Sequence, residues 1–145
     1  MTLVYRQAGL ADLEVLTGFN AGLQRDQGSL QPLAEAALRQ RLADWLNDGD
    51  YQAILAEKDV RPMGYALYRL EDERIFLRHL YVVPGARRQG LGRAFYDHLR
   101  EQLWPADRPV QLNVLANNAR GQAFWQALGF EAFSLTLQQS PAHPH

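Results

Sequence analysis

A strand that leads directly into a basic, glycine-containing helix start is the feature that most restricts the fold of this chain. Residues 75–83 are rich in β-branched and aromatic side chains, which favours a β-strand. Pro84-Gly85-Ala86 ends that strand, and apolar residues at every third or fourth position predict a helix that begins near Gly90. A strand followed so closely by a helix requires a sheet with helices packed on it.

Apolar periodicity divides the rest of the chain into further short elements. Alternation predicts strands at residues 2–7, 51–57, 63–70, 110–115 and 130–137, and a repeat of three to four residues predicts helices at 10–23, 33–46 and 119–128. The resulting order, β-α-α-β-β-β-α-β-α-β, indicates an α/β fold of the α+β, mixed-sheet kind. We expect a single domain at residues 1–139. A disordered tail is expected at 140–145, where two prolines stand without apolar periodicity.

Composition excludes several classes of function. With 145 residues the chain has the length of one domain. It contains no cysteine, which rules out a thiol nucleophile, a disulfide framework and a cysteine-ligated metal. A net charge of −1 argues against a bulk electrostatic grip on nucleic acid or on an anionic membrane. The histidines show no metal-ligand spacing, so we expect no metal site. Without a leader-like or membrane-spanning segment, a cytoplasmic protein is expected.

The helix start near Gly90 has the properties of a diphosphate cradle. The first turn of a helix presents unpaired backbone N–H groups at the positive end of the helix dipole. Gly90 and Gly92 let a phosphate approach that backbone, and Arg87, Arg88 and Arg93 add positive charge. From the residues alone, a dinucleotide loop, a P-loop, a nucleic-acid patch and an ordinary solvated basic corner stay open. The dinucleotide loop would need a third glycine that this chain lacks, and the P-loop would need a Lys-Ser or Lys-Thr pair that is also missing.

Two motifs carry a resemblance to a known family. The segment Arg87-Arg-Gln-Gly-Leu-Gly92 resembles motif A, [Q/R]-x-x-G-x-[G/A], of the GNAT superfamily of acetyl-CoA-dependent N-acetyltransferases. The segment Asn118–Phe130 resembles that family's motif B. The resemblance implies a GNAT-like fold: a central, mostly antiparallel sheet, splayed between its fourth and fifth strands and flanked by four helices.

The resemblance also implies where acetyl-CoA would bind. Backbone groups of the fourth strand would pair with the pantetheine arm, amides of the glycine loop would hold the pyrophosphate, and Asn118 would reach the coenzyme from the other side unless it serves only as a helix N-cap. The residues expected to bind the cofactor are Leu80, Tyr81, Val82, Arg87, Arg88, Gln89, Gly90, Leu91, Gly92, Arg93, Asn118 and Trp125.

The chemistry implied is direct attack of an amine on the thioester, because without cysteine no acetyl-cysteine can form. Members of the family often use a motif-B tyrosine to protonate the leaving thiolate, but this chain has Trp125 there. Tyr81, Tyr96 or water could replace it, or activity could be weak or lost. For the general base we consider His79, provided that a bulge turns it toward the cleft; the alternative is a histidine packed against a covering helix.

Regular alternation of the fourth strand gives further expectations. It places Phe76, Arg78, Leu80 and Val82 on one face and Leu77, His79, Tyr81 and Val83 on the other. Arg78 would then be suited to reading a carboxylate on the acceptor. The catalytic candidates are His79, Arg78 and Tyr81.

Three functions follow as hypotheses. The first is an N-acetyltransferase that uses acetyl-CoA and a primary amine of a small molecule, amino acid or peptide. The second is an acyl-CoA-binding module with little catalysis, and the third is a Rossmann-type nucleotide binder, which the missing third glycine disfavours. The acceptor depends on residues 25–32 and on the C-terminal strand, which carry no motif. A homodimer stays open.

Overall fold

The computed structural model describes residues 3–29 and 32–142. Its strands are β1 (Val4–Ala8), β2 (Gln52–Lys58), β3 (Arg61–Leu70), β4 (Ile75–Val82) and β5 (Val110–Gln111). Its α-helices are α1 (Leu13–Asp26), α2 (Glu35–Asp48), α3 (Leu91–His98) and α4 (Ala119–Ala127). Two 3₁₀ turns, η1 (Leu10–Asp12) and η2 (Pro84–Gln89), precede α1 and α3, and a π-helical segment, η3 (Leu99–Leu103), continues α3. The predicted starting residue of the first strand, Thr2, and the tail residues 143–145 lie outside the described residues.

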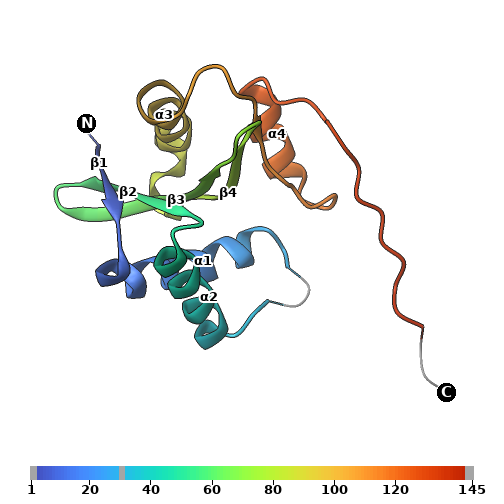
Figure 1. The fold of residues 1–145 in the computed structure, drawn as a ribbon, viewed down its shortest axis with the longest axis horizontal. Coiled ribbons are helices and arrows are strands. Elements are labelled where there is room, and N and C mark those ends of the chain that lie inside the picture. The colour runs from blue at the N-terminus through green and yellow to red at the C-terminus, as the bar shows by residue number, and fades with distance from the viewer. Residues whose placement is uncertain (1–2, 30–31, 143–145) are drawn as a thin grey trace.

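The five strands form one mixed sheet in the order β1-β2-β3-β4-β5. The first four are antiparallel neighbours, and β5 joins β4 in parallel through the α3 crossover. Helices α1 and α2 cover one face of the sheet, while α3 and α4 lie on the other side (Figure 1). The predicted fold class, with its splayed mixed sheet and four helices, is confirmed.

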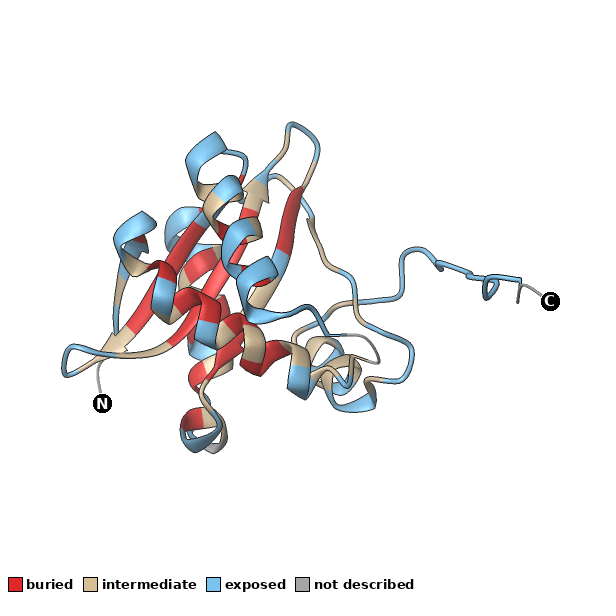
Figure 2. Ribbon diagram, turned by 90° about the horizontal axis from the view of Figure 1, so that it is seen from below, coloured by how far each residue is buried: buried red, intermediate tan, exposed pale blue. Residues whose placement is uncertain are grey.

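Because both faces are covered, the central strands are buried on both sides (Figure 2). In β2, for example, Ala53 and Leu55 pack with α1 and α2, whereas Ile54 and Ala56 pack with α3. The two helical layers therefore pack on separate apolar cores, with the sheet between them.

Strand β4 contains the bulge on which the histidine prediction depended. Its register against β3 pairs Leu67 with His79 but Tyr68 with Leu77, so Arg78 is the extra residue. A bulge shifts the alternation of side chains by one position. Phe76 therefore lies on the α1–α2 face together with Tyr81, and Leu77 lies on the α3 face together with Leu80. The sequence-based division of β4 into two regular faces was wrong at this point.

The C-terminal part of the sheet is shorter than predicted. β5 has two residues instead of the expected 110–115, and no strand forms at 130–137. Residues 131–142 leave the body as an extended, exposed segment (Figure 1). Phe133, Leu135 and Leu137 are each more than 80% exposed, at 82%, 81% and 83%. The alternation is present, but β5 offers too short an edge for a further strand to pair with it.

Candidate functional site

The sheet opens between β4 and β5 almost as soon as the two strands have met. They pair only at Ile75–Val110 and Phe76–Gln111, next to a hydrogen bond from Ile75 N–H to the Pro109 carbonyl at 2.9 Å. β4 continues to Val82, and within the described residues no strand pairs with this part of its β5 side. The predicted splay is therefore present and leaves an open backbone edge.

The open edge belongs to alternate residues of β4. Val83 N–H donates to the Met63 carbonyl at 2.8 Å, so residues 81 and 83 turn their backbone groups toward β3. Leu80 and Val82 then face the gap, and the Val82 carbonyl indeed accepts a bond from Arg87 Nε at 2.8 Å. Three residues were expected to pair with a pantetheine arm. Leu80 and Val82 present backbone groups to the gap, whereas the backbone of Tyr81 pairs with β3.

The glycine loop ends in a helix start beside this edge. Arg88 and Gln89 belong to the 3₁₀ turn η2, and Gly90 caps α3 with φ 74°, a left-handed conformation that favours glycine. The first intrahelical bond runs from Ala94 N–H to the Gly90 carbonyl at 3.1 Å. The amides of residues 91–93 precede it and are thus the unpaired donors of the helix start.

Gly92 has a second reason to lack a side chain. A Cβ at this position would lie 3.3 Å from Cζ of Phe124, so the glycine allows α4 to pack closely against α3. Leu91 is buried and anchors the first turn. Arg93 is exposed on the surface, where its Nε lies 4.0 Å from the Asp97 carboxylate.

Arg87 does not point at the helix start. Its guanidinium forms an ion pair with Asp26 of α1, bonds the Val82 carbonyl, and lies 5.4 Å from the centre of the Tyr81 ring. The side chain therefore ties the glycine loop to the α1 layer. The positive charge expected around the cradle is correspondingly smaller than the sequence indicated.

Motif B contributes a helix cap and an aromatic cluster. Asn118 Oδ1 accepts a hydrogen bond from Gly121 N–H at 3.0 Å, as the N-cap alternative predicted. Trp125 packs edge-on against Tyr96 of α3, with ring centres 5.8 Å apart, and against Phe130 at 5.2 Å. Burial raises the pKa of Tyr96, so that phenol keeps its proton at neutral pH. Of the two tyrosines considered as acids, Tyr96 is the one that lies beside Trp125.

Tyr81 occupies the opposite face of the sheet. Its ring packs against Phe19 of α1 with centres 5.4 Å apart, and it is only 7% exposed. A Cβ on Gly22 would lie 2.5 Å from the Tyr81 hydroxyl oxygen, so this glycine makes the room for the phenol.

The bulge at Arg78 brings two of the catalytic candidates against α2. The Arg78 guanidinium lies 4.6 Å from the centre of the Trp45 ring, and its Nη1 is 3.4 Å from the Tyr51 hydroxyl. His79 packs near the same indole, 6.2 Å between ring centres, and its Nδ1 is 2.9 Å from the Tyr65 hydroxyl. Burial, helped by the charges of Arg41 and Arg78, lowers the pKa of His79 to about 3. At neutral pH the imidazole is uncharged and a weak base.

Arg41 of α2 is a member of this cluster that the sequence did not single out. Its guanidinium lies 4.8 Å from the centre of the Trp45 ring, and Nη2 is 3.5 Å from Asn20 Oδ1 of α1. The sequence pointed to Arg41 only through its position on α2 beside the apolar stripe of Leu38, Leu42 and Trp45. The stripe indicates which face of α2 is buried, but it does not predict which side chains Arg41 contacts.

Comparison with known proteins decides the family. A family model described as "Acetyltransferase (GNAT) family" matches residues 21–130, a stretch that includes both motifs and the open edge of β4. This chain belongs to the GNAT acetyltransferase family.

Relatives agree with this assignment. The chain is 34% identical over 94 residues to an uncharacterised N-acetyltransferase of Mycobacterium tuberculosis; the match covers 63% of this GNAT chain and 60% of the relative. The match to this curated relative thus spans less than two thirds of the relative's length. Among solved structures, a possible acetyltransferase from Clostridium difficile has a TM-score of 0.78 at 17% identity, with 99% of each chain covered. A predicted acetyltransferase from Clostridium acetobutylicum, determined with acetyl-CoA, has a TM-score of 0.76 at 16% identity, with 96% of each chain covered.

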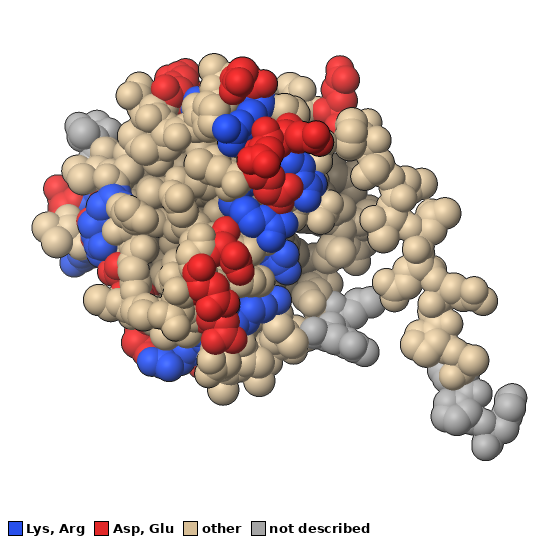
Figure 3. Space-filling model, in the orientation of Figure 1, with Lys and Arg blue, Asp and Glu red and all other residues tan. Residues whose placement is uncertain are grey.

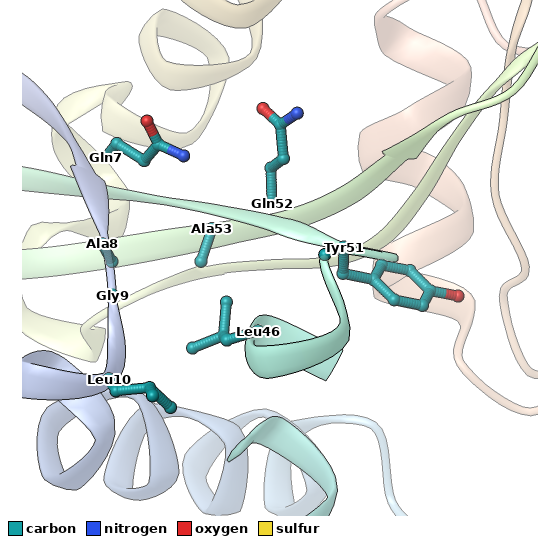
Figure 4. Close-up of a pocket in the computed structure, with 9 residues that line it drawn as sticks. Gln7, Ala8, Gly9, Leu10, Leu46, Tyr51, Gln52 and Ala53 are labelled. Atoms are coloured by element: carbon teal, nitrogen blue, oxygen red, sulfur yellow. The ribbon is translucent and has the colours of Figure 1, made fainter. Parts of the chain in front are cut away.

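The described residues of this GNAT protein also form a pocket away from the glycine loop. A pocket of about 340 Å³ lies between the start of β2, the end of β1 and the end of α2, lined by Leu10 and Leu46 among others (Figure 4). By the strand register it lies at the end of the sheet where β4 begins, whereas the glycine loop follows the other end of β4. On the face shown in Figure 3, basic and acidic side chains are interspersed, with no extended basic patch.

The described residues carry neither a cluster of metal-ligand side chains nor a membrane-spanning helix. They include no group of three or more histidine, aspartate or glutamate side chains placed to hold a metal ion. No described helix is long and apolar enough to cross a membrane.

Proposed function

We propose that this GNAT protein transfers the acetyl group of acetyl-CoA to a primary amine of a small molecule, amino acid or peptide. The observation that carries the proposal is the continuity of the open β4 edge at Leu80 and Val82 with the unpaired amides at the start of α3. An extended chain with amides, followed by a diphosphate, is the ligand that fits such a surface. The similarity of the fold to a protein determined with acetyl-CoA supports it.

In this proposal each cofactor residue has a defined task. The N–H groups of Leu80 and Val82 pair with the pantetheine arm and the thioester. The amides between Arg88 and Arg93 take the pyrophosphate. Arg87 holds the loop in place through the Val82 carbonyl and Asp26 rather than through the phosphates. Asn118 and Trp125 border the coenzyme from α4.

The reaction is an acyl transfer without a covalent enzyme intermediate. The amine nitrogen forms a bond with the acetyl carbon, the carbon–sulfur bond breaks, the amine loses a proton and the thiolate gains one. An N–H at Val82 directed at the developing oxyanion would contribute a few kcal/mol. An alkylamine has a pKa near 10.4, so only about one molecule in a thousand is neutral near pH 7.4. Since His79 is a weak base here, solvent takes the proton, and the rate should rise with pH.

The test is a thermal-shift titration with acetyl-CoA, with NAD and ATP as controls. Acetyl-CoA at a hundred times its Kd should stabilise the fold by about 2.7 kcal/mol, which is several degrees for a domain of this size. Thiol release is then followed on a panel of amines. A shift with NAD in place of acetyl-CoA, or none with either, would overturn the proposal.

A second candidate is an acyl-CoA-binding module with little catalysis. It is favoured by Trp125 at the position of the usual phenol and by the low pKa of His79. Binding of acetyl-CoA without thiol release on any amine would identify it. Self-association as a homodimer and a cytoplasmic location stay predictions.

A further inference from the structure

Two arginines from different parts of the chain lie against one indole. Arg41 comes from α2 and Arg78 from the bulge of β4, and their guanidinium carbons lie 4.8 and 4.6 Å from the centre of the Trp45 ring. We call Arg41, Arg78, Trp45 and the neighbouring Asn20 the arginine cluster. Arg78 is two residues beyond Phe76, the last β4 residue that pairs with β5, so the cluster lies where the sheet begins to open.

Neither arginine of the cluster has an acidic partner in the described part of the chain, which includes all sixteen Asp and Glu residues. Other arginines do, for example Arg39 on the same helix, whose Nε is 2.8 Å from Glu14. Burial and the nearby charge of Arg78 lower the pKa of Arg41. Two cations held together, with Arg41 partly buried, cost free energy unless an anion joins them.

The buried polar atoms in and next to the cluster that lack a hydrogen-bond partner are also of one kind. The Nε of Arg41 and the Nδ2 of Asn20 are buried without a hydrogen-bond partner, and so is the Nε2 of Gln24 one turn further along α1. All three are donors. The amide oxygens of the same side chains are already used: Asn20 Oδ1 accepts from Arg41 Nη2, and Gln24 Oε1 accepts from Leu33 N–H at 2.9 Å. Buried donors left without acceptors are rare in folded proteins, so this set is complementary to an oxyanion.

We infer that the arginine cluster binds a carboxylate of the acceptor, so that the acetylated amine belongs to a molecule with a carboxylate group. This inference rests on the proposed acetyltransferase function and specifies its acceptor. Arg41 and Arg78 supply the charge-assisted bonds, Asn20 supplies a neutral donor, and Trp45 forms an apolar wall. A carboxylate fits better than a phosphate because a half-buried site accommodates one negative charge at lower desolvation cost than nearly two.

The first test measures binding without turnover. Thermal unfolding is followed while the protein is titrated with 4-aminobutanoate, butylamine or inorganic phosphate at constant ionic strength. The carboxylate is expected to stabilise the wild type, and the amine without a carboxylate is not. Absence of any carboxylate effect, or a stronger effect of phosphate, would overturn the inference.

The second test compares three variants. Arg41→Met and Arg78→Gln should each weaken carboxylate binding tenfold or more, because a charge-assisted hydrogen bond is lost. The control Arg39→Gln, on the same helix but exposed and paired with Glu14, should change it less than twofold. Arg78 is exposed, so its variant is expected to fold even if Arg41→Met does not.

A third measurement separates this inference from the proposed function. Acetyl-CoA binding is titrated in the wild type and in all variants, and it should be unchanged. Failure of the wild type to bind acetyl-CoA would refute the acetyltransferase proposal alone. Normal acetyl-CoA binding together with equal KM values for 4-aminobutanoate and butylamine would refute the carboxylate site alone.

Discussion

Nδ1 of His79 lies 2.9 Å from the hydroxyl of Tyr65, a side chain without exposed surface on the neighbouring strand. Tyr65 is buried, His79 is partly buried, and the imidazole lies near Trp45 of α2. Burial lowers the pKa of His79 to about 3, against an ordinary value near 6.5. The position that the sequence offered as a base is therefore occupied by a packed, hydrogen-bonded ring.

Acid should destabilise this protein through His79. Between pH 6.5 and pH 3 the unfolded chain binds a proton that the folded chain does not, so the free energy of unfolding falls as the pH falls. At pH 5 the loss from this group should reach about 2 kcal/mol. Denaturant unfolding at pH 7.5 and pH 5 measures it, and His79→Gln, which keeps a partner for Tyr65, should lack this part of the pH dependence. An equal loss in both proteins would contradict the low pKa.

Gly22→Ala should destabilise the fold by about 1–3 kcal/mol, because its Cβ would lie 2.5 Å from the Tyr81 hydroxyl oxygen in a packed core. Combining it with Tyr81→Phe should restore part of the loss. Gly18→Ala on the same helix is the control: no atom lies within 4 Å of its Cβ, so it should stabilise α1 by up to about 1 kcal/mol. Equal effects of the two alanines in chemical denaturation would show that Tyr81 does not pack as described.

Asn118 has two roles that substitution can separate. Asn118→Ala removes the acceptor for Gly121 N–H and should cost about 1 kcal/mol of stability, whereas Asn118→Asp keeps the cap. If the side chain also contacts the coenzyme, as proposed, both variants should bind acetyl-CoA more weakly in calorimetric titration. Normal acetyl-CoA affinity in the aspartate variant would leave Asn118 as a cap only.

Trp125→Tyr tests whether catalysis is limited by the absence of a tyrosine at this position to protonate the leaving thiolate. A phenol at this position of α4 would supply a proton to the leaving thiolate, and positioned acids contribute roughly 10²–10⁴ in rate. We therefore expect an increase in kcat of at least about tenfold. Trp125→Phe, which keeps an aromatic ring beside Tyr96 but has no hydroxyl, is the matched control. If both variants behave alike in thiol-release assays, proton donation at residue 125 does not limit the rate.

The C-terminal segment should add little to the stability of the body. Phe133, Leu135 and Leu137 are almost fully exposed, so a chain that ends after Phe130 should unfold within about two degrees of the full chain. A chain that ends after Gly129 also loses Phe130, which packs against Trp125, and should unfold at a lower temperature. Differential scanning calorimetry at two protein concentrations is the measurement. A concentration-dependent loss on removing residues 131–145 would show that the segment joins copies of the chain.

Sequence features that act over a few residues were sufficient to predict most of the helices and strands. The antiparallel strands, the helix start at Gly90 and the cap at Asn118 follow from residues near one another in the chain, because propensity, turn chemistry and capping act over a few positions. Motif spacing was likewise sufficient for the family, since both motifs lie within the matched residues.

Other features depended on contacts between distant residues. Alternation assumes a regular ladder, and the bulge at Arg78 appears only in the register of β3 against β4. The alternating residues 130–137 form no strand because a strand needs an edge to pair with, and β5 ends after two residues. The meeting of Arg41 with Arg78 depends on how α2 packs on the sheet.

The sequence by itself thus determined the element order up to α4, the glycine loop and the family of this protein. The tertiary structure decided which backbone groups of β4 stay open, that His79 is neutral, and that two arginines share one indole. The physical reason is that capping and periodicity are local, whereas burial, pKa and charge pairing arise between residues brought together only by folding.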